Sequence, residues 1–105
     1  MIRLSLFLFA AAAWAQNPAN GKKLFEAKAC YECHGWAGQG GLAGPRLAQT
    51  KLNLQGFRSI LRNPPPSQMP PYRAAVLNDA EAADIFAFIQ ALPAPAPVES
   101  IPLLK

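Results

Sequence analysis

The segment 29–35, with the sequence ACYECHG, contains both cysteines and the only histidine of the 105-residue chain. Two residues separate Cys30 from Cys33, and His34 follows directly. Thiolate sulfur and imidazole nitrogen are the protein atoms that most readily bind transition metals, exchange disulfides or hold a cofactor. These three side chains are therefore the first candidates for site chemistry.

Three alternatives fit this pattern poorly. A structural zinc site needs four ligands, and the sequence offers no second cluster of cysteine and histidine. A thioredoxin-type dithiol is expected beside a β–α–β unit, and no strand pattern is apparent. A disulfide between Cys30 and Cys33 would close a very small loop and would leave His34 without a role.

The pattern Cys-x-x-Cys-His is instead typical of covalent haem attachment. Two thiols on one helical turn can add to the two vinyl groups of haem, and the adjacent histidine then reaches the iron from the same side. A sixth iron ligand is still needed, and after the first fifteen residues the only methionine is Met69. A lone methionine usually fills a core, but Met69 stands in a proline-rich loop without apolar periodicity. We therefore predict His34 and Met69 as the axial ligands.

Residues 1–15 have the features of a secretory signal: a basic residue, an apolar run, and Ala13 and Ala15 as an A-x-A cleavage site. The apolar run is about a dozen residues, whereas roughly 20 are needed to cross a bilayer as a helix. We expect cleavage after Ala15, a periplasmic protein and no membrane span in the mature chain. Residues 16–92 are expected to form one domain, and the proline-rich residues 93–105 a flexible tail.

The mature chain is expected to be mildly basic. Its formal charge of +4 falls by one unit when Arg3 leaves with the signal. The basic residues are scattered among apolar positions rather than clustered as in proteins that bind nucleic acids. The sequence thus predicts no nucleic-acid partner, although its positive charge could steer an acidic protein.

Helical periodicity indicates three helices. The first is expected over about 18–32; the second follows the cap Asn53 and ends at Pro64, and the third follows the cap Asn78 and ends before Pro93. Five of the seven glycines fall in residues 35–49, which therefore read as a loop. Loops of this length are unusual in a small domain unless they enclose something.

The sequence resembles the small, single-haem class I c-type cytochromes over roughly residues 17–92. The resemblance rests on motifs in a fixed order around Cys-x-x-Cys-His: Gly21-x-x-x-Phe25, Gly44-Pro45-x-Leu47, Met69-Pro70-Pro71-Tyr72 and Ile85-x-x-Phe88. It implies an all-α cytochrome c fold, in which three or more helices and long loops wrap around one covalently bound haem c.

The resemblance also implies roles for single residues. The carbonyl of Pro45 would accept a hydrogen bond from His34, and Gly21 would let the first and last helices cross closely, with Phe25 against Ile85 and Phe88. Four apolar side chains would line the haem pocket or simply fill the core: Leu47, Phe57, Ile60 and Leu61. Three side chains are candidates to hydrogen-bond a haem propionate: Trp36, Arg46 and Tyr72.

Iron with both axial positions filled by the protein has no open position for a substrate, which favours one-electron transfer over catalysis. Methionine sulfur favours the ferrous state and raises the reduction potential relative to two histidines. Three functions stay open. The chain could be a diffusible electron shuttle between redox-partner proteins such as a dehydrogenase, an oxidase or a cytochrome complex. It could be a dedicated cytochrome subunit of an oxidoreductase, or a haem enzyme or gas sensor with a labile sixth ligand.

Overall fold

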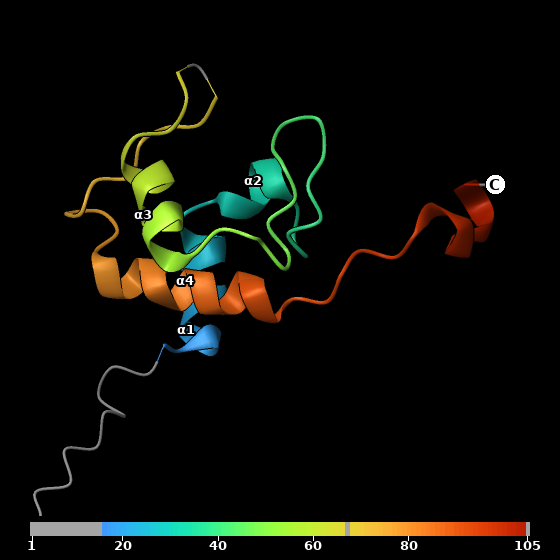
Figure 1. Ribbon diagram of the computed structural model, residues 1–105, viewed down its shortest axis with the longest axis horizontal. Coiled ribbons are helices and arrows are strands. Elements are labelled where there is room, and N and C mark those ends of the chain that lie inside the picture. Colours follow the sequence, from blue (N-terminus) through green and yellow to red (C-terminus); the bar gives the residue numbers. More distant parts are fainter. Residues whose placement is uncertain (1–15, 67, 105) are drawn as a thin grey trace, which may run out of the picture.

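A computed structural model describes residues 16–66 and 68–104. The predicted signal, residues 1–15, lies outside the described residues. The described chain forms four helices and two short 3-10 turns (Figure 1): α1 (Pro18–Ala27), α2 (Cys30–His34), α3 (Leu54–Arg62), α4 (Asp79–Ala91), η2 (Val98–Ser100) and η3 (Pro102–Leu104). Within this part of the chain, β pairing is confined to an isolated bridge between Gly41 and Gly44. The all-α prediction is confirmed.

The predicted first helix is wrong in its extent, because it is two helices. α1 ends at Ala27, and α2 begins at Cys30 after Ala29 takes a left-handed conformation with φ 62°. This conformation costs an L-residue roughly 1–2 kcal/mol, so helices seldom break at alanine. Neither glycine nor proline marks the break in the sequence. Because of this break, the axis of α2 points in a different direction from the axis of α1.

The caps of the later helices are as predicted. The side chain of Asn53 accepts a hydrogen bond from the amide of Gly56 at 2.7 Å, and α3 ends two residues before Pro64. At α4, Asn78 and Glu81 form a reciprocal capping box with bonds of 2.8 and 3.0 Å. Such a box satisfies amides that the first helical turn leaves unpaired.

The crossing of α1 and α4 forms the base of the molecule. Gly21 is buried there, and a Cβ at this position would overlap the backbone carbonyl of Asp84. The ring of Phe25 packs edge-to-face on that of Phe88, with centroids 5.3 Å apart, and Ile85 belongs to the same core. The close crossing implied by the sequence is confirmed.

The core lies between α1, α3 and α4. Its most deeply buried large side chains are Phe25, Leu77 and Ile89. Beyond α4 the chain leaves this helical body and runs outward to η2 and η3 (Figure 1). The flexibility expected of residues 93–105 stays a prediction.

Candidate functional site

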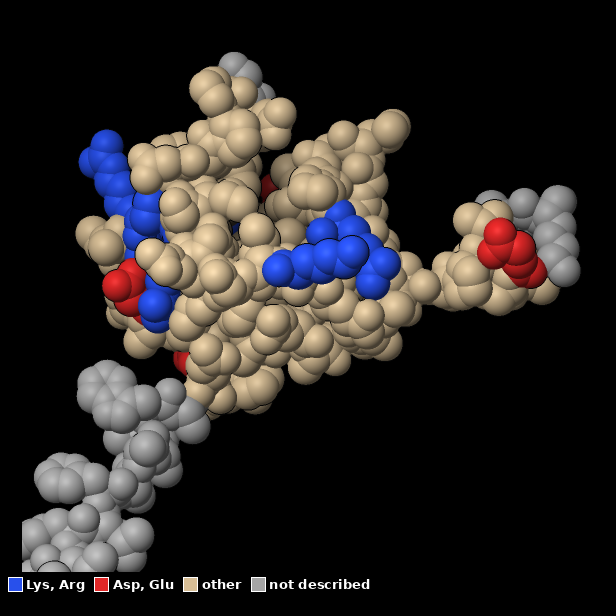
Figure 2. All heavy atoms as spheres, viewed as in Figure 1, with Lys and Arg blue, Asp and Glu red and all other residues tan. Residues whose placement is uncertain are grey.

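The predicted ligands lie on two sides of the molecule's upper half (Figure 1). One side is built by α2 and the glycine-rich loop that follows it, and the other by α3 and the proline-rich loop that carries Met69. The surface is hollowed between these two projecting loops (Figure 2). The site is therefore assembled from segments that lie about 35 residues apart in the sequence, which only the fold can bring together.

The short helix α2 places Cys30, Cys33 and His34 at positions i, i+3 and i+4, which share one helical face. Both cysteines are free; Cys30 is half-buried and Cys33 is exposed. Burial raises the pKa of the Cys30 thiol to about 11. This argues against a reactive dithiol, because redox-active cysteines have lowered pKa values. Among the described residues, no three His, Cys, Asp or Glu side chains form a cluster that could hold a metal ion.

His34 is held from behind by the glycine-rich loop. Its Nδ1 atom lies 2.7 Å from the carbonyl oxygen of Pro45, the contact that the family resemblance implies. When Nδ1–H donates to this carbonyl, the lone pair of Nε2 is left for a metal. Gly44 allows the approach, since a Cβ there would lie 3.0 Å from the imidazole atoms Nδ1 and Cε1. The sequence analysis assigned no such role to Gly44, although its position directly before Pro45 could have indicated that it lies close to His34.

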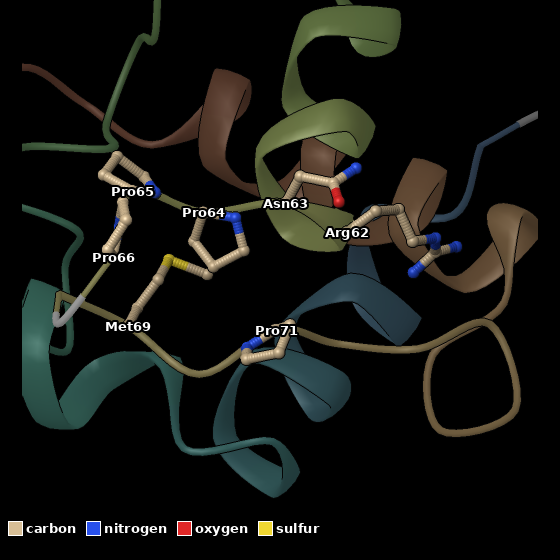
Figure 3. Close-up of a pocket in the computed structure, with 7 residues that line it drawn as sticks. All are labelled: Arg62, Asn63, Pro64, Pro65, Pro66, Met69 and Pro71. Atoms are coloured by element: carbon tan, nitrogen blue, oxygen red, sulfur yellow. The ribbon is translucent and has the colours of Figure 1, made fainter.

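Met69 lies in the facing loop and is half-buried against the core. It borders a hollow of about 350 Å³ between the end of α3 and the proline-rich loop. In Figure 3 the Met69 side chain extends toward the ring of Pro64. The walls of this hollow are Arg62, Asn63, Pro64, Pro65, Pro66, Met69 and Pro71. The proline rings stiffen the backbone that presents the methionine sulfur.

The apolar residues expected around a haem divide into two groups. Phe57 and Leu61 are each 6% exposed, and Phe57 packs on Phe86 with ring centroids 5.5 Å apart, so the core accounts for their burial. Leu47 is half-buried against the core. Ile60, in contrast, is 38% exposed although it lies between two buried residues of the same helix. The core therefore does not account for the exposed part of Ile60, and single exposed apolar residues are common on protein surfaces.

The three propionate candidates are engaged elsewhere to different degrees. Trp36 is 63% exposed and stacks on Tyr31, with centroids 3.7 Å apart. Arg46 donates from Nε to the carbonyl of Ala48 at 3.0 Å, which leaves other guanidinium donors for an anion. Tyr72 departs from the expectation, because its single hydroxyl proton goes to the carbonyl of Lys28 at 2.8 Å rather than toward a propionate.

Comparison with protein families identifies the kind of domain that this chain forms. The family model described as cytochrome C oxidase, cbb3-type, subunit III matches residues 16–89. The chain belongs to this family of c-type cytochrome domains. Comparison with curated proteins and with solved structures gave no significant match.

The cytochrome domain accordingly has the predicted fold and cofactor. It is an all-α cytochrome c domain that binds haem c covalently, and the family has an electron-transfer role. The residues present fit haem c. The thiols of Cys30 and Cys33 stand three positions apart on one helix, the imidazole of His34 is held through Nδ1, and the thioether of Met69 lies in the facing loop. None of the described helices of the cytochrome is long and apolar enough to cross a membrane.

Proposed function

We propose that the chain is a one-electron carrier in which Cys30 and Cys33 hold haem c and His34 and Met69 ligate its iron. The observation that carries the proposal is the 2.7 Å contact between His34 Nδ1 and the carbonyl of Pro45. This contact selects the tautomer with a free Nε2 and fixes the plane of the ring. The bound haem supplies the exchange of one electron between its ferric and ferrous states.

The protein's part in this exchange is to keep the ligand set unchanged. Pro45 holds His34 in one orientation, and the prolines around Met69 restrict the backbone of its loop. A rigid backbone around both ligands lowers the reorganisation energy that accompanies a change of oxidation state. If His34 and Met69 both ligate the iron, no coordination position would be left for a substrate or a gas, which supports electron transfer over catalysis.

We place the carrier in the periplasm, between redox-partner proteins, on the strength of the signal-like residues 1–15. A second candidate function is a cytochrome subunit that delivers electrons within an oxidase complex, which the description of its family favours. The exposed apolar side chains of the tail, Val98 and Leu103, would suit attachment to a larger partner. Size-exclusion chromatography of the native protein from its own cells separates the two, because a subunit elutes with the complex and a shuttle elutes alone.

The test of the ligand set is the optical spectrum of the protein matured with its haem. The ferric wild type should show the Met–iron charge-transfer band, and Met69→Ala should lose it. Val76→Ala is the matched control, because Val76 is 51% exposed and lies seven residues further along the same segment. A wild type without covalent haem would overturn the proposal. A Met69→Ala band equal to the wild type's would overturn the axial assignment, and ready binding of CO to the ferrous wild type would favour an enzyme or sensor.

A further inference from the structure

Tyr72, three residues after Met69, is the most firmly bonded residue of the Met69 loop. Its amide donates to the carbonyl of Leu61 at 2.7 Å, and its carbonyl accepts from the guanidinium of Arg62 at 2.9 Å. Both bonds tie the loop to the last turn of α3. Its hydroxyl reaches across the molecule and donates to the carbonyl of Lys28 at 2.8 Å.

The carbonyl of Lys28 is available because the helix breaks there. In an unbroken helix the amide of Glu32 would bond to Lys28, but it bonds to Ala29 at 3.1 Å instead. A half-buried carbonyl without a donor costs free energy comparable to a lost hydrogen bond. The Tyr72 hydroxyl supplies this donor at the turn from which α2 departs with Cys30, Cys33 and His34.

Arg62 supports the same residue from the other side. One guanidinium nitrogen donates to the carbonyl of Tyr72, and another pairs with the carboxylate of Asp79 at 2.9 Å. The planar guanidinium can hold both partners at once, which a lysine ammonium on a flexible stem does less well. Because Asp79 is the first residue of α4, this pair also ties the Met69 loop to the start of that helix.

We propose that Tyr72 is a positioning residue that holds Met69 against the iron by joining the Met69 loop to the turn before α2. The proposal rests on the His34 and Met69 ligation put forward above. In this proposal the bond from the Tyr72 hydroxyl to the carbonyl of Lys28 restrains outward movement of the Met69 loop, and so stabilises the state in which the Met69 sulfur ligates the iron. Removing the hydroxyl should make the methionine-off state easier to reach.

Imidazole binding to the ferric, haem-loaded protein measures this equilibrium, because imidazole takes the sixth position only when Met69 has left it. Tyr72→Phe should bind imidazole about fivefold more tightly, the factor that one net hydrogen bond is worth, while the ferric charge-transfer band is retained without imidazole. Arg62→Lys should act in the same direction, since it weakens the second bond to the same residue.

Two control variants separate this role from general stabilisation. Val76→Ala shortens an exposed side chain further along the same segment, and Ile89→Val weakens a fully buried position of α4. Both should leave imidazole affinity within twofold of the wild type. Equal affinity in Tyr72→Phe and the wild type would overturn the proposal, and so would an equal rise in Ile89→Val. If Met69→Ala leaves the wild-type band unchanged, the ligand assignment itself fails, and the two failures are thereby distinguished.

Discussion

The Nδ1 atom of His34 lies 2.7 Å from the carbonyl oxygen of Pro45, eleven residues further along the chain. This bond joins the helix that carries the haem-attachment motif to the glycine-rich loop. Gly44, the residue before Pro45, lies close to the same imidazole ring, because a Cβ there would be 3.0 Å from Nδ1 and Cε1. When Nδ1–H donates a hydrogen bond to a carbonyl, the electron density that the histidine offers to a metal through Nε2 rises.

Gly44→Ala should therefore raise the reduction potential. Its Cβ would lie 3.0 Å from the His34 ring and 3.0 Å from the carbonyl of Cys33, so the ring and the loop must separate slightly. A weaker bond to Pro45 makes His34 a poorer donor and favours the ferrous state. We expect a rise of roughly 20–40 mV in a redox titration, the equivalent of about half to one net hydrogen bond. Gly41→Ala is the control, because nothing lies within 4 Å of a Cβ there. An unchanged or lower potential in Gly44→Ala would contradict this role.

Gly21→Ala should destabilise the fold. The new methyl group would overlap the carbonyl of Asp84 and crowd the Cβ of Phe88, both of which belong to the crossing helix. Separating α1 from α4 loosens the packing of Phe25 on Phe88, and overpacking of this kind costs about 1–3 kcal/mol. Urea unfolding of the haem-loaded protein would measure the loss.

Gly41→Ala again serves as the comparison, and its free energy of unfolding should stay within about 0.5 kcal/mol of the wild type, as for most surface changes. If the two glycine variants unfold at the same urea concentration, the close crossing does not limit stability.

Features that depend only on a local pattern, such as helix caps, could be predicted from the sequence. Asn53 and Asn78 marked the starts of two helices because a capping side chain acts within three residues of itself. The roles of Gly21 and Pro45 came from resemblance to a family and not from a local pattern. The break at Ala29 has no local signal in the sequence, and the carbonyl of Lys28 beside it is bonded by Tyr72, which is 44 residues away in the chain. The hydroxyl of Tyr72 was likewise expected to bond a propionate. Its partner in the structure is the carbonyl of Lys28, which only the fold brings close.

The stability of the protein should fall above about pH 10, and Tyr72 should cause part of the decrease. Burial raises the pKa of Tyr72 above its ordinary 10.0, with smaller contributions from Cys30, Cys33 and Glu32. The contributions of the cysteines disappear once both sulfurs are thioethers, so burial and Glu32 remain. Because the unfolded chain then loses its proton at a lower pH than the folded one, the stabilisation is complete below pH 10 and is lost as the pH rises through the folded pKa.

Tyr72→Phe tests this assignment through the pH dependence of urea unfolding. The variant should be less stable at pH 7 by about 1 kcal/mol, because the bond to Lys28 is lost. Between pH 10 and 11 its stability should fall less steeply than that of the wild type. Parallel curves over this interval would show that Tyr72 does not titrate as a buried phenol.

Positive charge near the site should govern the rate of electron exchange with small charged reagents. Arg46 and Lys51 border one shallow hollow of the surface, and Arg46 directly follows the residue that holds His34. Figure 2 shows two separate groups of basic side chains on the face of the helical body that is in view. Reduction of anionic ferricyanide by the ferrous protein should slow as salt is added, whereas reduction of a cationic cobalt(III) ammine should accelerate, because screening weakens attraction and repulsion alike. At an ionic strength of about 10 mM, Lys51→Gln should slow the ferricyanide reaction roughly twofold.

Lys22→Gln removes the same charge from α1 and should have a smaller effect. Equal rates in these two variants would mean that net charge alone, rather than the Arg46 and Lys51 face, guides the encounter.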